Sequence, residues 1–215
     1  MTLVFSGPLP AAELEADHKW WEIYEASFPI EEREPASVIY RSIEAGPGVA
    51  LRIRQDRVTT GIATLHRLQE VPLAFCVYLA IAAQARGSGL GSSFFRHVAN
   101  TAGPGGMVWE VEDPARARNS DEERQRVRRI QFFERAGGQL LDAPYCQPPL
   151  NGHEPVPMRL LWRAGASDAP LPDAARLIRA IYFEKYGAIN GIDGEVLERL
   201  LATDPGSSGG RAFCG

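Results

Sequence analysis

The sequence has 215 residues, of which 45% are hydrophobic, and a formal net charge of −4. A chain of this length buries one full core with room for a small appendage. The near balance of charge, without a dominant basic patch, excludes nucleic acid as a main partner. The start carries no cationic segment, and the longest apolar run is far shorter than the roughly 20 residues of a membrane span. We therefore expect a soluble protein that does not associate with membranes.

Three cysteines lie far apart in the chain, at Cys76, Cys146 and Cys214, without the pairing typical of a metal site. This cysteine usage predicts a reduced protein in the cytoplasm. None of the four histidines has a partner at ligand spacing, so we expect no bound metal.

Hydrophobic periodicity predicts elements along the whole chain. The first third is expected to hold a strand at 3–5, helices over 13–27 and 36–44, and an antiparallel hairpin that turns at Asp56 and Arg57. A strand buried on both faces follows at 73–81, then a helix over 91–101, a strand over 105–112 and a charged helix over 121–136. Two closing strands are expected, one in 137–150 and one after 156, and two more helices after 173.

The composition divides the chain into four parts. We expect an α/β domain over 1–163, a linker over 164–173 and a helical extension over 174–203, with a flexible tail over 204–215. The linker is predicted from "AGASDAPLPD", which is rich in alanine, proline and aspartate.

The stretch "VYLAIAAQARGSGLGSSFFRHV" combines a buried strand, a glycine loop and a helix start. Free N–H groups and the helix dipole favour an anion there, and Arg86 with nearby serines adds donors. A P-loop would need a lysine after the last glycine, and a dinucleotide fingerprint would need G-x-G-x-x-G. Neither spacing is present, so we expect a different phosphate loop, with a glycine-rich turn that binds nothing as the alternative.

Three motifs resemble those of the GNAT N-acetyltransferases. "QARGSG" is similar to the Q/R-x-x-G-x-G/A signature of that family, and "RRIQFFERAGGQLL" resembles its following helix-to-strand motif. "YEASFPIEER" resembles the end of the first helix and the acceptor-side loop. The resemblance covers roughly Leu3 to Trp162. It implies a mixed, mostly antiparallel central sheet flanked by helices, with splayed central strands that form a cleft for acetyl-CoA.

The resemblance also implies how the coenzyme is held. Backbone groups of Leu79, Ala80 and Ile81 would bind the pantetheine arm as an added strand would. The pyrophosphate would lie in the loop and first helical turn, formed by Gln84, Arg86, Gly87, Ser88, Gly89, Leu90, Gly91 and Ser92. Asn119 is a further candidate for coenzyme contact, because an asparagine often has that role in the family; an ordinary loop asparagine is the alternative.

Acidic residues are the candidates for catalysis. Glu110 and Glu112 lie two apart in a predicted strand and share a face, where paired carboxylates raise each other's pKa and attract a cation. That arrangement suits a base for an ammonium substrate, whereas a solvated strand face is the alternative. Glu31, Glu32 and Glu34 form a second acidic group in the loop that resembles the acceptor side. Glu31 and Glu32 are candidate substrate contacts, unless the group serves only solubility.

Two positions depart from the family pattern. The tyrosine that often acts as general acid is replaced by Phe133, for which Tyr145 is a candidate substitute. Some members carry a glutamate where this chain has Val77. The sequence thus predicts an N-acetyltransferase that moves an acetyl group to a small-molecule or peptide amine by direct attack in a ternary complex, as a monomer or homodimer. A non-catalytic acyl-CoA-binding or regulatory module is the alternative.

Overall fold

The computed structural model describes residues 2–165 and 173–202, so the predicted tail and most of the predicted linker lie outside the described residues. An eight-stranded sheet runs through the molecule in the order β1-β2-β3-β4-β5-β8-β6, and β7 also pairs with β8. Only the β4–β5 pair is parallel, which confirms the mostly antiparallel sheet. The strands are β1 (Leu3–Ser6), β2 (Gly48–Gln55), β3 (Val58–Arg67), β4 (Ala74–Ile81), β5 (Gly106–Glu112), β6 (Gln139–Leu140), β7 (Tyr145–Gln147) and β8 (Val156–Ala164).

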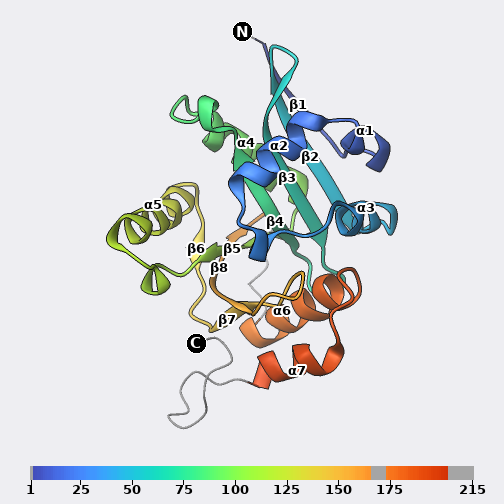
Figure 1. Cartoon of the computed structure of the whole chain (residues 1–215), viewed down its shortest axis with the longest axis vertical. Coiled ribbons are helices and arrows are strands. Elements are labelled where there is room, and N and C mark those ends of the chain that lie inside the picture. The colour runs from blue at the N-terminus through green and yellow to red at the C-terminus, as the bar shows by residue number, and fades with distance from the viewer. Residues whose placement is uncertain (1, 166–172, 203–215) are drawn as a thin grey trace.

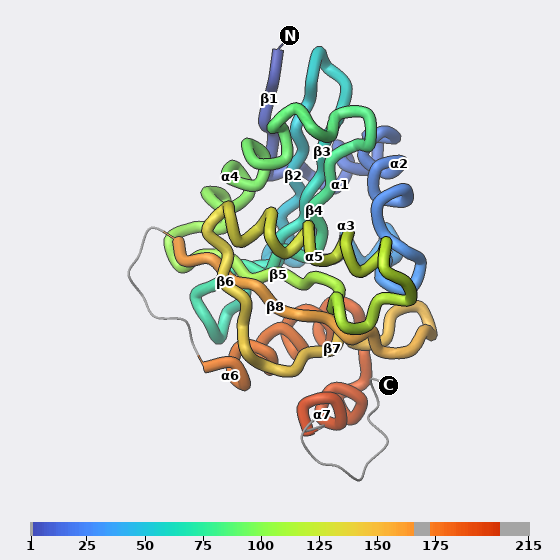
Figure 2. The backbone as a smooth tube through the Cα atoms, turned by 90° about the vertical axis from the view of Figure 1, so that its left-hand side faces the viewer, coloured from blue at the N-terminus to red at the C-terminus, as the bar shows by residue number. Residues whose placement is uncertain are grey.

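Helices cover both faces of this sheet (Figure 1 and Figure 2). The α4 and α5 helices pack on one face, and α1 to α3 pack on the other. The α-helices are α1 (Ala11–Glu15), α2 (His18–Ser27), α3 (Ala36–Glu44), α4 (Leu90–Ala102), α5 (Ser120–Arg135), α6 (Ala174–Ala180) and α7 (Gly194–Ala202). A π-helical segment, η4 (Ile181–Gly187), continues α6, and short 3₁₀ turns form η1 (Ile30–Glu32), η2 (Ala83–Ala85) and η3 (Pro114–Arg116).

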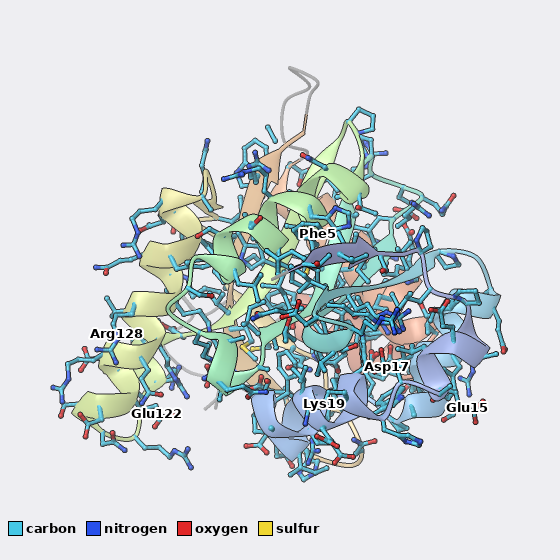
Figure 3. All side chains as sticks on the ribbon, turned by 90° about the horizontal axis from the view of Figure 1, so that it is seen from above. Phe5, Glu15, Asp17, Lys19, Glu122 and Arg128 are labelled. Carbon is cyan, nitrogen blue, oxygen red and sulfur yellow. The ribbon has the colours of Figure 1, made fainter. Side chains whose placement is uncertain are left out.

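The single helix predicted over 13–27 is wrong, because Asp17 divides it into α1 and α2. Asp17 Oδ1 accepts a hydrogen bond from the Trp20 N–H at 3.1 Å and so caps α2. Its Oδ2 accepts from Arg52 Nη1 at 2.9 Å and from Thr59 Oγ1 at 2.8 Å. Figure 3 shows Asp17 on the side of α1 and α2 that faces the sheet. The break in the helix therefore anchors it to the sheet.

The closing strand predicted in 137–150 is also divided, into β6 and β7. Residues 141–144 between them end in Pro144, which has no N–H to donate to a strand ladder. Pairing resumes at Tyr145, which lies opposite Met158 of β8. This second, short strand fixes the position of Tyr145 at the end of the sheet.

The β4 and β5 strands are paired over only three residues. The pairs run from Ala74 with Met107 to Cys76 with Trp109. The antiparallel pairing of β4 with β3 continues to Ile81, so β4 itself does not end at Cys76. Beyond Cys76, the edge of β4 that faces β5 has no strand partner in the part of the chain that the structure describes. The two central strands are thus splayed, as expected.

The C-terminal helices share a core with the sheet. Leu177, Tyr182 and Tyr186 belong to the same buried cluster as Phe75 of β4 and Val108 of β5. Their packing gives these helices a physical role that the sequence did not indicate: they cover the face of β4, β5 and β8 opposite α4 and α5. The domain boundary at residue 163 stays a prediction.

Candidate active site

The gap between the splayed strands contains a small cavity of about 40 Å³. Its walls come from the loop after α2, from β4, from β5 and from the strand pair β7–β8. Among its lining residues are Glu32, Tyr78, Glu110, Glu112, Arg129 and Gln147. Three predicted site residues, Glu32, Glu110 and Glu112, are therefore brought together, although Glu32 lies far from the other two in the sequence.

Alternation along β5 places Glu110 and Glu112 on one face of the sheet. Trp109 and Val111 lie on the opposite face, in the core beneath α4 and α5. Phe133 is buried in that same core, against Trp109. Phe133 is therefore separated from Glu110 by the sheet.

The carboxylate of Glu110 is held by two tyrosines. Its Oε1 accepts hydrogen bonds from the Tyr145 hydroxyl and, at 2.9 Å, from the Tyr186 hydroxyl. Burial raises the pKa of Glu110 to about 7, opposed by the two tyrosine hydrogen bonds and assisted by the negative charge of Glu34. A carboxyl group with a pKa near neutral is well suited to take up and release a proton at physiological pH.

The carboxylate of Glu112 is held differently, by ion pairs to α5. Its Oε2 lies 3.1 Å from Arg129 Nη1, and its Oε1 lies 3.3 Å from Arg126 Nη2. The two glutamates share a face as expected, but Glu112 is neutralised by guanidinium groups whereas Glu110 is bound to neutral hydroxyls. This difference singles out Glu110 as the candidate base.

The loop after α2 is held at the cavity through its backbone. The Glu32 carbonyl oxygen accepts from the Tyr78 hydroxyl at 2.9 Å and from Gln147 Nε2 at 3.5 Å. Burial, followed by the charges of Glu112 and Glu110, raises the pKa of the Glu32 carboxyl to about 8. Glu31 is half-buried and does not line the cavity.

Two residues important to this site were not predicted, Lys185 and Tyr186, and the pairing of Glu34 with Lys185 was not predicted either. Lys185 and Glu34 are almost fully buried and form an ion pair. Asn190 completes the pair, since its Oδ1 accepts from Lys185 Nζ at 2.9 Å and its Nδ2 donates to Glu34 Oε1 at 2.8 Å. The only sequence signal was "YFEKYG", in which a lysine stands among aromatic residues; nothing local pairs it with a loop 151 residues away.

The glycine loop has the geometry of an anion site. Gly87 and Gly89 have φ values of +82° and +80°, which favour glycine, and Gly89 caps α4 without a side-chain hydrogen bond. Arg86 Nε donates to the Ile81 carbonyl at 3.0 Å, and Ser88 Oγ donates to the Ala85 carbonyl at 2.9 Å. These bonds fix the loop at the end of β4 and leave the first turn of α4 without a side-chain cap.

Asn119 has a structural role. Its Oδ1 accepts from the backbone N–H groups of Asp121 at 3.1 Å and Glu122 at 2.9 Å, so it is the N-cap of α5. Contact between Asn119 and a coenzyme stays a prediction. In the described residues, no cluster of three or more metal-ligating side chains occurs, and no helix is long and apolar enough to cross a membrane.

No protein-family profile and no curated protein matches the chain. Solved structures do match it. A GNAT-family protein from Bacteroides thetaiotaomicron aligns with a TM-score of 0.69 at 22% identity, over 88% of this chain and 99% of that one. A phosphinothricin acetyltransferase of the GNAT superfamily from Sinorhizobium meliloti, solved with acetyl-CoA, aligns with a TM-score of 0.53 at 14% identity, over 81% and 95%.

Naa50 from Arabidopsis thaliana, solved with the bisubstrate analogue CoA-Ac-MVNAL, aligns with a TM-score of 0.53 at 16% identity, over 76% of this chain and 99% of that one. Nearly the whole length of each of these three structures aligns with this chain. The splayed β4–β5 pair and the glycine loop before α4 are the features that the sequence resemblance implied. The chain has the fold of the GNAT acetyltransferases.

Proposed function

We propose that this protein transfers an acetyl group from acetyl-CoA to a primary amine by direct attack in a ternary complex. The observation that carries the proposal is the Glu110 carboxylate, with a pKa of about 7, beside the gap between β4 and β5. The fold supports the donor, since relatives in fold are solved with acetyl-CoA or with a coenzyme-based bisubstrate analogue.

The residues present fit the coenzyme. The free edge of β4 offers the backbone of residues 79–81 to an extended arm, as a neighbouring strand would. The uncapped first turn of α4 offers N–H groups to a pyrophosphate, next to Arg86 and the loop glycines. These two features adjoin, because the loop of residues 82–89 joins β4 to α4 directly.

Proton transfers are assigned to Glu110 and Tyr145. When bound, acetyl-CoA would supply an activated acetyl group as a thioester. Glu110 takes the proton that the amine loses as its nitrogen bonds to the acetyl carbon. The Tyr145 hydroxyl, hydrogen-bonded to Glu110, supplies a proton to the departing sulfur and recovers one from the Glu110 carboxyl. Backbone N–H groups on the free edge of β4 stabilise the carbonyl oxygen.

The acceptor is proposed to enter as a cation, whose ammonium group loses one proton to water before its nitrogen attacks. Three glutamates, Glu32, Glu110 and Glu112, line the cavity, and only Arg129 among the lining residues carries positive charge. Burial raises the pKa of Glu32 and Glu110, and a bound ammonium group favours the ionised form of both. A small-molecule or peptide amine fits this chemistry. On sequence grounds we place the protein in the cytoplasm, as a monomer or homodimer.

Release of free thiol from acetyl-CoA with a broad panel of amines tests this function. Saturable, amine-dependent release that falls about 10²- to 10⁴-fold in Glu110→Gln supports it, because that is the usual range for loss of a general base. Calorimetric binding of acetyl-CoA without thiol release on any amine would instead favour the acyl-CoA-binding module. Absence of coenzyme binding would exclude both.

A further inference from the structure

The cavity beside Glu110, of about 40 Å³, offers a ligand mainly hydrogen-bond acceptors. The Tyr78 hydroxyl already donates to the Glu32 carbonyl oxygen at 2.9 Å, and Arg129 Nη1 already donates to Glu112 Oε2 at 3.1 Å. Within residues 2–165 and 173–202, Glu110 accepts hydrogen bonds through its Oε1, and no hydrogen bond reaches its Oε2 or the Glu32 carboxyl group. What this cavity leaves open to a ligand is therefore chiefly oxygen lone pairs.

Gln147 supplies one more acceptor, and this acceptor is buried without a partner. Gln147 lies on β7, is only 4% exposed and lines the cavity. Its Nε2 donates to the Glu32 carbonyl oxygen at 3.5 Å, whereas its Oε1 has no hydrogen-bond partner in the described part of the chain. Buried acceptors almost always have a donor, because an unmade hydrogen bond in the interior is destabilising. The Oε1 of Gln147 thus indicates a donor that arrives with a ligand.

The size and the walls of the cavity limit what a ligand can place there. About 10–15 Å³ of such volume holds one water molecule, so a cavity of about 40 Å³ holds about three groups of that size. Phe28, Val77 and Met158 form apolar parts of its wall. An ammonium nitrogen with one methylene carbon fits this combination of acceptors and apolar surface. A carbon that also carries a side chain and a carbonyl group needs more room than the cavity provides.

Charge excludes one further kind of acceptor molecule. The cavity has three acidic lining residues, Glu32, Glu110 and Glu112, and the guanidinium group of Arg129 is paired with Glu112. A carboxylate on the carbon that carries the amine would be repelled by these like charges and would find no free counter-ion among the described residues that line the cavity. We therefore expect α-amino acids to be poor acceptors, although their amines are primary.

We propose that the acceptor is a primary amine on an unbranched carbon, such as the side-chain amine of lysine, and that Gln147 determines this specificity. An ammonium group has three N–H donors, and three acceptors belong to residues that line the cavity: Glu110 Oε2, Gln147 Oε1 and the Glu32 carboxylate. This inference rests on the proposed function and narrows its acceptor. It excludes the N-terminal amine of a peptide, whose carbon carries a carbonyl group and, except in glycine, a side chain.

Two isomers of acetyl-lysine amide test the substrate class in the full-length protein. Nα-acetyl-lysine amide has its free amine on an unbranched carbon, and Nε-acetyl-lysine amide has it on the branched carbon beside the carbonyl group. With acetyl-CoA as donor and free thiol release as the readout, kcat/KM is expected to be about tenfold or more higher for the Nα-acetyl isomer, as when a pocket rejects a group too large for it. The α-amine has the lower pKa, about 8 against about 10.4, so more of it is neutral at pH 7. Amine basicity alone therefore predicts the opposite preference.

Gln147→Met tests the role of the amide. Methionine has nearly the length of glutamine but no Oε1, so KM for the Nα-acetyl isomer is expected to rise about tenfold or more, as for loss of a hydrogen bond to a charged group, while kcat changes little. Because Oε1 is unpartnered in the described residues, the unfolding temperature of the free protein should not fall. A glutamine with only a structural role would show the reverse, a lower unfolding temperature with an unchanged KM. Gln139→Met is the matched control, because Gln139 is exposed on β6 and does not line the cavity.

Each other outcome is decisive. Equal or faster transfer to the Nε-acetyl isomer would overturn the substrate class and leave the proposed function intact. Transfer to other amines of the panel but to neither isomer would have the same meaning. An unchanged KM in Gln147→Met would overturn the role of Gln147. Absence of transfer to every amine would refute the proposed function and this inference with it.

Discussion

The Tyr186 hydroxyl donates a hydrogen bond to Glu110 Oε1 at 2.9 Å, joining two residues 76 positions apart. Tyr186 lies in the π-helical segment η4, and Glu110 lies on β5. The C-terminal helices therefore contribute directly to the candidate active site. Lys185 and Tyr186 are consecutive residues of this segment, one bound to Glu34 and the other to Glu110.

Replacement of Tyr186 by phenylalanine is expected to raise the pKa of Glu110 further, because the Tyr186 hydrogen bond favours the ionised carboxylate. Loss of a hydrogen bond worth about 1 kcal/mol corresponds to a change of about 0.7 in the pKa of Glu110. Carbon-13 NMR titration of the Glu110 carboxyl measures the shift directly, without requiring turnover. If kcat/KM depends on Glu110, its acidic limb should move to higher pH by the same amount.

The matched control is Tyr182→Phe. Tyr182 lies in the same segment and is equally buried, but its hydroxyl donates to the Cys146 carbonyl at 2.7 Å and not to Glu110. This variant should leave the titration of Glu110 unchanged. Equal shifts in the two variants would show that general loosening of the segment, and not the hydrogen bond, is responsible.

Glu110→Gln should remove the acidic limb of the pH profile of kcat/KM. A general base is inactive when protonated, so activity falls as the pH drops through its pKa, here about 7 and not the usual 4.5. Glu112→Gln is the comparison and should keep this limb, because Glu112 is held by Arg126 and Arg129 and not by the tyrosines. Titration of the amine substrate contributes equally in every variant, so a difference between the variants reports on the protein. A limb near pH 7 that persists in Glu110→Gln would contradict this assignment.

Much of the fold followed from local pattern, and the failures have a common physical origin. The strands and helices around the glycine loop were predicted because alternation, helical spacing and glycines are local signals. The break at Asp17 was missed because its cause is Arg52 and Thr59, which reach it only in the folded sheet. Side-chain capping that is coupled to a distant strand leaves no periodic trace in the sequence.

The candidate site was only partly predicted, because some of its residues give a local signal and others come together only in the folded protein. Glu110 stood out because alternate acidic residues in an apolar strand are unusual, and Tyr145 because Phe133 left the acid unassigned. The partners that give Glu110 its properties, Tyr186 and the Glu34–Lys185 pair, come from the two ends of the chain. Desolvation depends on the assembled core, so no local pattern indicated a pKa near 7.

Gly89→Ala is expected to weaken coenzyme binding beyond its effect on stability. Its φ of +80° costs an L-residue about 1 kcal/mol, and any relaxation reorients the first N–H groups of α4. Gly103→Ala is the control, because Gly103 also has a positive φ, +97°, and open space around it, but lies at the other end of α4. Calorimetry and thermal unfolding of both variants separate the effects. Equal loss of coenzyme affinity in the two would contradict a role for the loop.

Lys185→Met should destabilise the protein by about 3–5 kcal/mol, since it leaves the buried Glu34 carboxylate without its counter-ion. The double variant Glu34→Gln with Lys185→Met removes both charges and should recover much of that loss. Urea unfolding of the two single variants and the double variant gives the coupling energy. If the two substitutions have additive effects on the free energy of unfolding, the ion pair makes no contribution of its own.

The three-residue seam between β4 and β5 also has a mechanical consequence. Strands β1 to β4 form one leaf of the sheet and β5 to β8 form another, joined by three residue pairs that end at Cys76 and Trp109. The C-terminal helices span both leaves, since their core cluster includes Phe75 of one and Leu160 of the other. A ligand that fills the gap between β4 and β5 would contact both leaves and hold them in place. We expect amide hydrogen exchange at residues 77–81 to slow when coenzyme A binds, while exchange in the β2–β3 hairpin stays constant. The rigidity of the sheet at the β4–β5 gap thus depends on whether a ligand occupies it.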